Sequence, residues 1–306
     1  MNKTRVSLLY TTVKAHWGYI VRQPGATAAQ TAYILPPPPT VVGAFAAVLG
    51  RLLGIPDAHT GRRKKHVLTG LMECALQATI AAGAGLLAAG EGGAGGGVAL
   101  VEEPSRIIGA PYKGGGALNR ALSRPIALSA GDLLPVQAVG AASGPGTLLV
   151  LAWLLDTGRL ESCLGRRIGN ELLSVVPSSV FRLGSREGLV SVVGEQGRLP
   201  GYGAVSGEKL EVLGSGHEYE SILYQPASCT LPESRASVAS VVLLDEHYRE
   251  REYLAPASPG SGPGVIYPPS SPARFRVAHG SCLAYAPRGG LRALALAVPG
   301  AGVVSE

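Results

Sequence analysis

Aromatic and basic side chains lie close together soon after the start of the chain. Trp17 and Tyr19 carry rings, Arg22 carries a guanidinium group and His16 an imidazole. Aromatic rings stack on unpaired bases, and a guanidinium group can bond to a phosphate through two parallel hydrogen bonds. This combination predicts contact with single-stranded RNA. The alternative is that the same side chains only pack a loop over a sheet.

A second polar segment lies before the middle of the chain. It holds three consecutive glycines at 114–116, flanked by Tyr112, Lys113, Asn119, Arg120 and Arg124. Glycine allows the backbone to approach a ligand closely, and the flanking side chains can donate hydrogen bonds to phosphate oxygens. The segment is predicted to contact RNA, with an ordinary hairpin tip as the alternative.

The positive charge is concentrated in the half of the chain that carries both segments. Residues 1–150 contain 13 Lys and Arg against 6 Asp and Glu, whereas residues 151–306 contain 14 against 15. The net charge of +6 at pH 7 therefore arises from the first half. This asymmetry predicts a polyanion bound by the first half and protein partners for the second.

A run of four prolines, Pro36 to Pro39, must position the first of these segments. Each proline fixes its own φ and disfavours helical backbone in the residue before it, so the run predicts an extended lead-in. Thr40 follows as a natural N-cap, and residues 40–54 are apolar nearly all round. We expect a helix there, buried against a broad sheet.

The remaining pattern predicts an α+β fold. We expect strands at 5–13, 97–102, 133–139, 175–182 and 189–193, helices at 67–82 and 146–156, and short later strands such as 238–244, 275–278 and 291–298. The order strand, helix, strand, strand, helix, strand is typical of the ferredoxin-like (RRM-like) fold. Residues 1–200 are therefore predicted to form a ferredoxin-like domain with an insert near 104–132. Residues 201–306 are predicted to be a β-rich C-terminal portion.

Composition and cysteine spacing limit the class of protein. With 46% hydrophobic residues in 306, the chain can bury a real core, and 43 glycines and 23 prolines indicate many turns. The four cysteines are widely spaced and form no C-x-x-C pair: Cys74, Cys163, Cys229 and Cys282. This spacing predicts neither disulfides nor a zinc site, and a cytoplasmic location without membrane contact. We expect no cofactor.

Motifs of known catalytic chemistry are not found in the sequence. It contains no G-x-x-x-x-G-K-[ST] phosphate loop, no H-E-x-x-H and no G-x-S-x-G elbow. His16, beside Trp17 and Tyr19, is the one histidine placed to act as a general acid or base on RNA. We expect it to stack or donate a hydrogen bond rather than catalyse, so the protein is predicted not to be an enzyme.

Two motifs carry a resemblance to a known family. The first runs from Trp17-Gly18-Tyr19 through Arg22 to Tyr33, the prolines, Thr40 and Gly43. The second is the segment 181–192, Phe-Arg-Leu-Gly-Ser-Arg-Glu-Gly-Leu-Val-Ser-Val. Together they resemble the CRISPR-associated (Cas) family-five proteins of the RAMP superfamily, in the archaeal type I-A form. The matched motifs lie within residues 5–195.

The resemblance implies a function in antiviral defence. Family members of this type are non-catalytic subunits of the Cascade surveillance complex that hold the five-prime handle of the CRISPR RNA (crRNA) and cap the backbone filament. The insert at 104–132 corresponds to their thumb hairpin. The implied partners are crRNA, the family-seven backbone subunit, the large subunit and the other type I-A subunits. The residues expected to contact RNA are Trp17, Tyr19, Arg22, Tyr112, Lys113, Asn119, Arg120, Arg124, Arg182 and Arg186.

Two other classes of function stay open at the level of sequence. One is a metal-independent endoribonuclease that processes CRISPR precursor RNA, as in relatives from another CRISPR subtype, with His16 as its acid or base. The other is a protein-binding scaffold that makes no RNA contact, in which the basic first half serves solubility.

Overall fold

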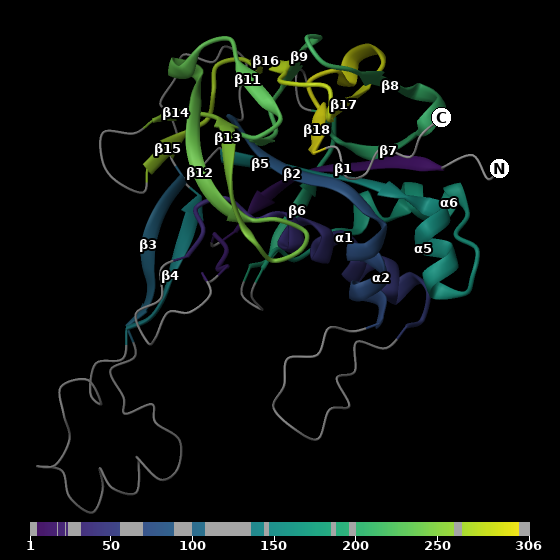
Figure 1. The fold of residues 1–306 in the computed structure, drawn as a ribbon. Coiled ribbons are helices and arrows are strands. Elements are labelled where there is room, and N and C mark those ends of the chain that lie inside the picture. Colours follow the sequence, from purple (N-terminus) through teal and green to yellow (C-terminus); the bar gives the residue numbers. More distant parts are fainter. Residues whose placement is uncertain are drawn as a thin grey trace, which may run out of the picture.

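The structure is a computed structural model, and it describes residues 5–16, 18–21, 23, 32–55, 70–88, 100–107, 136–143, 147–184, 188–195, 200–259 and 265–299. Helices and antiparallel strands are mixed along the chain, in agreement with the predicted α+β class. Figure 1 shows a central sheet with helices on one side and the C-terminal strands on the other.

The central sheet is built around β1 (Val6–Ala15) and β5 (Thr147–Asp156). Its strand order is β2-β5-β1-β6, with β2 at Thr79–Ala88 and β6 at Val190–Val193. All neighbouring strands are antiparallel. One edge of β1 is shared, because β6 pairs with its second part and β7 (Tyr202–Ser206) with its first.

Four helices cover one face of this sheet (Figure 1). They are α1 (Pro38–Leu52), α2 (Gly70–Ala78), α5 (Thr157–Leu164) and α6 (Asn170–Val175). Phe45 of α1 stacks on Trp153 of β5 with ring centroids 6.2 Å apart, and both side chains are fully buried. The indole of Trp153 also donates a hydrogen bond to the Thr79 hydroxyl at 2.9 Å. The helices therefore bury one face of the sheet in a continuous core.

The C-terminal portion covers the opposite face. Leu8 of β1 and Leu154 of β5 share a second core with Leu223, Leu294 and Leu296. The C-terminal portion approaches the sheet most closely at β2, where a Cβ on Gly85 would collide with the carbonyl oxygen of Ile222. The amide of Tyr224 donates to Ala84 at 2.9 Å next to this contact. The central sheet is therefore buried on both faces.

The C-terminal portion consists of small antiparallel sheets with the strand orders β10-β13-β12, β11-β16-β9 and β18-β17-β8. The strands are β8 (Leu210–Leu213), β9 (Glu218–Ser221), β10 (Gln225–Pro226), β11 (Thr230–Pro232), β12 (Val238–Leu244), β13 (Glu250–Pro256), β16 (Ala273–Val277), β17 (Cys282–Pro287) and β18 (Leu296–Pro299). The buried Gln225 amide joins them, since it donates to the carbonyls of Leu223 and Ala295 and accepts from the amide of Ala297. The C-terminal portion is β-rich, as expected.

A hairpin of β3 (Leu100–Ile107) and β4 (Val136–Ser143) connects β2 to β5 along the chain. It forms a separate sheet with β14 (Ser258–Pro259) and β15 (Val265–Tyr267) in the order β14-β15-β3-β4. The strands predicted at 97–102 and 133–139 thus exist, but they lie outside the central sheet. Figure 1 shows them extending away from the body of the protein.

Two sequence-based assignments of elements are wrong, and a third is too long. The predicted helix at 146–156 is β5, and the predicted helix at 67–82 contains only the short α2 before β2 begins. Both strands are apolar at successive positions because both faces of the sheet are covered, so the period of two that marks a strand is lost. The predicted strand at 175–182 is instead the end of α6 and a 3₁₀ turn, Pro177–Ser179.

Helix α1 begins earlier than predicted. Pro38 and Pro39 occupy its first turn, the N-cap is Pro37, and no side chain caps it. Proline is tolerated there because the first amides of a helix have no intrahelical partner in any case. Thr40 therefore lies inside the first turn instead of preceding it, and its amide donates to the Pro37 carbonyl at 2.9 Å.

Two disulfides contradict the prediction of unpaired cysteines. Cys74 of α2 is bonded to Cys163 of α5, and Cys229 to Cys282, with separations of 89 and 53 residues. The prediction was wrong because the fold brings together positions whose spacing in the sequence carries no pairing signal. No helix in the described part of the chain is both long and apolar enough to cross a membrane.

Replacing Gly85 by Ala is expected to weaken the contact between the sheet and the C-terminal portion. The new methyl group would collide with the Ile222 carbonyl, so the free energy of unfolding should fall by about 1–3 kcal/mol. Gly43→Ala in α1 is the control, because its methyl meets only Met72 at 3.8 Å and helix propensity should raise stability by ~0.5–1 kcal/mol. Urea unfolding of both variants measures the difference, and equal stability of the two would contradict this account.

Opening the bridge between α2 and α5 should also destabilise the fold. Cys163→Ser restores to the unfolded chain the freedom of a loop of 89 residues, which is worth about 2–4 kcal/mol. Urea unfolding under non-reducing conditions measures the loss. Ser162→Ala, at the exposed neighbouring position, should change stability by less than about 0.5 kcal/mol. An unfolding midpoint of Cys163→Ser equal to that of the wild type would show that the bridge contributes nothing.

Candidate nucleic-acid interface

The far end of β1 brings three polar side chains onto one face. Lys14 is directly opposite Ser191 in the β1–β6 pairing, and His16 follows two residues later. Residues two apart on a strand point to the same side. The His16 ring Nε2 lies 2.7 Å from the Ser191 hydroxyl, and the His16 amide donates to the Leu189 carbonyl at 3.2 Å. Lys14 and His16 are both exposed.

Residues 181–184 and 188–190 pair as the two arms of an antiparallel hairpin, the 181–190 hairpin, which packs against the segment that follows β1. The Leu183 amide donates to the Gly188 carbonyl at 2.7 Å, and the Val190 amide donates to the Phe181 carbonyl at 3.0 Å. Gly184 has a φ of +71°, and a Cβ there would lie 2.8 Å from the Ile20 carbonyl oxygen. Any residue with a Cβ would be strained at this φ and would clash with the Ile20 carbonyl. Glycine at position 184 therefore allows the hairpin to pack against residues 18–21.

Tyr19 lies in the core and is not exposed to solvent. Its side chain is only 2% exposed, and its hydroxyl donates to the Ile34 carbonyl. Burial raises the pKa of Tyr19 well above its ordinary value. The ring is therefore not available for stacking on a base, which corrects the role predicted for it. Tyr19 instead holds the loop after β1 against the segment that leads into the prolines.

The segment before the prolines is also held by a hydrogen bond and a buried tyrosine. The Tyr33 amide donates to the Val21 carbonyl at 2.8 Å, and the Tyr33 side chain is buried. Burial, with a smaller contribution from the Glu250 carboxylate, raises the pKa of Tyr33 to about 12. Farther along, the Tyr224 hydroxyl donates to the Pro36 carbonyl at 2.9 Å, which ties the C-terminal portion to the proline run.

Basic side chains surround the 181–190 hairpin. Arg182 is half-buried within it, and Lys14 is exposed on the adjoining strand. Neither forms an ion pair with a carboxylate of the described residues. The guanidinium group of Arg51, at the end of α1, lies 4.2 Å from the centre of the Phe181 ring. Phe181 packs against the core on the helix side, so Arg51 lies on that side of the sheet, whereas Lys14 follows Leu8 and Tyr10 on the opposite face.

The flat face of the central sheet cannot serve as an RNA platform. RNA-recognition domains stack bases on aromatic side chains exposed on their sheet. Here the face opposite the helices is covered by the C-terminal portion, and Tyr10 on it is only 8% exposed. A nucleic acid that contacts this sheet would therefore meet its ends or edges and not its faces.

Most of the residues predicted to contact RNA lie outside the described residues: Trp17, Arg22, Tyr112, Lys113, Asn119, Arg120, Arg124 and Arg186. Of the predicted set, the structure describes Tyr19 and Arg182 and places them at the same end of β1. Trp17 and Arg22 are neighbours of described residues in that loop. The hairpin β3–β4 flanks the segment that holds Tyr112 to Arg124.

Three residues of this region were missed by the sequence analysis: Lys14, Arg51 and Ser191. Lys14 and Ser191 could have been found from the exposed positions of two strands, once those strands are paired in the correct register. Arg51 gives no local signal, because a basic residue in the last turn of a helix is common for dipole reasons alone.

The described residues contain no group of three or more His, Cys, Asp or Glu side chains that could hold a metal ion. Among these residues, the only side-chain partner of His16 is the Ser191 hydroxyl. What the described part assembles here is a set of hydrogen-bond donors and cations.

Replacing Tyr19 by Phe tests the hydrogen bond that the Tyr19 hydroxyl donates. Loss of the hydrogen bond to Ile34 should lower the free energy of unfolding by about 0.5–1.5 kcal/mol. Affinity for single-stranded RNA, measured by filter binding, should not change, and it should stay the same in Tyr202→Phe, a control at an exposed tyrosine. A tenfold loss of RNA affinity in Tyr19→Phe alone would show that the Tyr19 hydroxyl, and not only the packing of its ring, is used in RNA binding.

A likeness to known proteins is found among solved structures. No family model matches the sequence, and no curated protein sequence matches it. Among solved structures, the chain is similar to a CRISPR protein from Archaeoglobus fulgidus, with 15% sequence identity and a TM-score of 0.49. The similarity covers 96% of this chain and 99% of that one.

Proposed function

We propose that this protein is a non-catalytic RNA-binding subunit of a CRISPR surveillance complex, Cascade of type I-A. In this role it holds the five-prime handle of the crRNA and caps one end of the backbone filament. It acts in the cytoplasm, with the family-seven backbone subunit, the large subunit and the other type I-A subunits as its protein partners.

One observation carries the proposal. The two segments that resemble family-five Cas proteins are far apart in the sequence, yet they pack against each other at the end of β1. Gly184 of the second segment contacts Ile20 of the first, and His16 bonds to Leu189 and Ser191. Segments that form one site are expected to meet in this way, whereas unrelated matches would be scattered over the fold.

The connectivity of the central sheet supports the same proposal. A ferredoxin-like domain has two strand–helix–strand units interleaved in one antiparallel sheet, with the first and third strands in the centre. The order β2-β5-β1-β6, with helices after β1 and after β5, has this form. The hairpin β3–β4 is inserted between the second and third strands of that sheet, which is where the thumb of the family is expected.

The charges indicate how RNA would bind. Lys14 and Arg182 would contact phosphates at the end of β1, and Trp17 would stack on an unpaired base. Arg22 and Arg186 would add donors to the same end, and the segment from Tyr112 to Arg124 would hold the RNA farther along. The C-terminal half, with 14 basic against 15 acidic residues, would face protein partners.

The Lys14→Ala and Arg182→Ala variants test the interface. Each should weaken binding of labelled handle RNA several-fold and reduce the slope of log affinity against log salt by about one, because one phosphate contact is lost. Lys209→Ala is the matched control, since this exposed lysine lies in the C-terminal portion away from the sheet end.

The salt slope distinguishes a phosphate contact from a change in folding. Thermal unfolding of each variant should match the wild type, because both side chains are at least partly exposed and lack ion pairs to described carboxylates. If Lys14→Ala, Arg182→Ala and Lys209→Ala all bind handle RNA with the same affinity and salt slope, RNA does not bind at this end of β1.

A further inference from the structure

One strand of the C-terminal portion leaves its outer edge open. β12 lies at the end of the sheet β10-β13-β12, and among the strands of the described residues only β13 pairs with it. Figure 1 shows β12 and β13 as a long hairpin in front of the central sheet. The open edge of β12 belongs to a different sheet from the end of β1 described above.

The backbone groups on this edge follow from the turn at the end of the hairpin. The Asp245 amide donates to the Arg249 carbonyl at 2.8 Å, and the pairing of β12 with β13 continues in the same register. In an antiparallel pair, residues that bond to the partner strand alternate with residues whose amides and carbonyls point away. Ser240 and Val242 therefore turn theirs outward. No described residue bonds to these outward groups.

The edge is exposed and lacks the residues that usually block strand edges. Val242 is 55% exposed, and Ser240 is exposed as well. Soluble proteins protect such edges with charged side chains, prolines or bulges. β12 reads Val-Ala-Ser-Val-Val-Leu-Leu and pairs with β13 without a bulge, so it has none of these features. An edge of this kind is a template for another extended strand.

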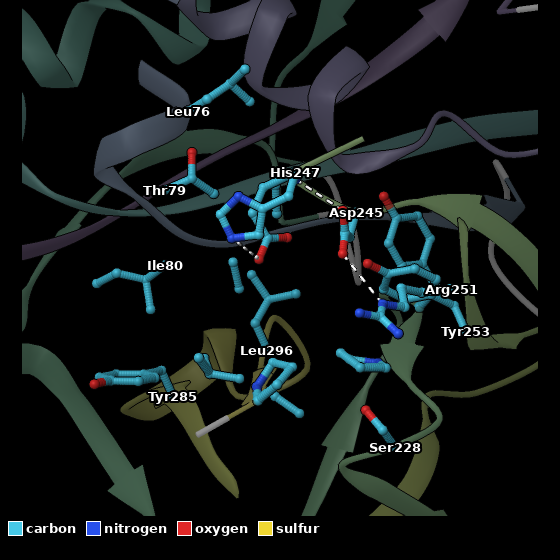
Figure 2. A pocket seen from close by; sticks show the side chains of 18 of the residues that line it. Leu76, Thr79, Ile80, Ser228, Asp245, His247, Arg251, Tyr253, Tyr285 and Leu296 are labelled. Atoms are coloured by element: carbon cyan, nitrogen blue, oxygen red, sulfur yellow. Dashed lines mark hydrogen bonds and ion pairs between the residues drawn. The ribbon is translucent and has the colours of Figure 1, made fainter. Parts of the chain in front are cut away.

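The turn after β12 holds the edge in place. The Asp245 carboxylate accepts from the amides of His247 and Arg249 at 2.9 and 2.8 Å, and it lies 3.4 Å from the guanidinium group of Arg251. Figure 2 shows Asp245 between His247 and Arg251. A hairpin fixed in this way loses little conformational freedom when a strand is added, which favours binding.

Two carboxylates on the outer face of the hairpin indicate the charge of the strand that would bind. Glu252 is directly opposite Val242, and Glu250 is opposite Leu244, so both lie on the face of Val242. Both are exposed, and neither forms an ion pair with a described side chain. The Glu252 carboxylate extends over β12, where it accepts from the Ser240 hydroxyl at 2.6 Å. Adjacent strands lie about 4.8 Å apart, so a basic side chain on an added strand reaches this carboxylate.

The opposite face of the hairpin offers an apolar surface. Ala239 and Val241 are half-buried there beside the core, and Arg251 is already engaged by Asp245. An added strand would therefore place apolar side chains on this face and basic ones on the face of Glu252. A polynucleotide has no row of amides to match the edge, and its charge is of the same sign as that of the two carboxylates.

We propose that an extended segment of a partner protein adds as a strand to the outer edge of β12. The backbone of the segment pairs with Ser240 and Val242, its basic side chains face Glu252, and its apolar side chains lie beside Val241. This interaction goes beyond the proposed binding of RNA and does not depend on it.

A synthetic probe tests the edge. The probe is a fluorescein-labelled heptapeptide amide, Thr-Val-Lys-Val-Lys-Val-Thr, titrated with the full-length protein and followed by anisotropy. Saturable binding is expected, and Val242→Pro should weaken it about tenfold because proline lacks the outward amide hydrogen. Proline is tolerated at an edge position of this kind. Val242→Thr is the matched control, since it keeps that hydrogen and should bind within about threefold of the wild type.

A variant of Glu252 tests the charge. Glu252→Gln keeps an acceptor for the Ser240 hydroxyl and removes the charge, so it should weaken binding of this peptide about threefold. A peptide with Glu in place of both Lys residues should bind the wild type more weakly than the Lys peptide, and Glu252→Gln should narrow that difference. Glu208→Gln, at an exposed carboxylate outside this hairpin, is the control and should leave both affinities unchanged.

A measurement on the peptide keeps the test decisive if Val242→Pro does not fold. In an added strand, alternate amides point toward β12 and the others point away. Methylation of one alternate set of peptide amide nitrogens should abolish binding, and methylation of the other set should leave it, whichever way the strand runs. Equal effects of the two sets, or no saturable binding at about 1 mM peptide, would overturn the proposal.

Two other occupants of the edge would also overturn the proposal. Displacement of the peptide by an octauridylate would assign the edge to RNA. Sedimentation of the wild type as a dimer and of Val242→Pro as a monomer would assign it to a second copy of this chain. The assay contains no crRNA, so its failure leaves the RNA proposal to its own test.

Discussion

Burial of the central sheet on both faces is the constraint on which the rest of the structure depends. β5 lies in the middle of the sheet, and its side chains pack on helices through Trp153 and on the C-terminal portion through Leu154. Close approach on the second side requires glycine at position 85 of β2. With both faces covered, the sheet itself can offer a ligand only its ends and edges. The end of β1 is such a place, because Lys14 and His16 are exposed there.

The same constraint explains how much of the fold was predictable from sequence. β12 keeps exposed positions and was found because burial on one side leaves a readable alternation, whereas β1 was found although both of its faces are buried. β5 was taken for a helix because it is apolar on both sides, and the helix expected at 67–82 extended over the first residues of β2 for the same reason. The disulfide between Cys74 and Cys163 was missed because its partners meet only through packing of α2 on α5. The proline run placed α1 correctly, with an error of two residues at its start.

The candidate site, like the fold, was only partly predictable from the sequence. The segments around His16 and around Arg182 could be singled out from residue types, but nothing local indicates that they meet. That contact depends on the register of β6 against β1 and on the positive φ of Gly184. Tyr19 was assigned to RNA because aromatic rings serve both as core and as stacking surface, and composition alone does not separate the two uses. Because Tyr19 is buried and its hydroxyl bonds to Ile34, its ring belongs to the core.

The central claim is that this protein holds the repeat-derived handle of a crRNA. The most direct measurement is to express the full chain with a CRISPR array, purify it, and sequence the RNA that remains bound. The account predicts an absorbance ratio at 260 and 280 nm above that of protein alone, and reads enriched for one repeat-derived five-prime sequence. Bound RNA without any enriched handle, or protein free of RNA, would contradict it.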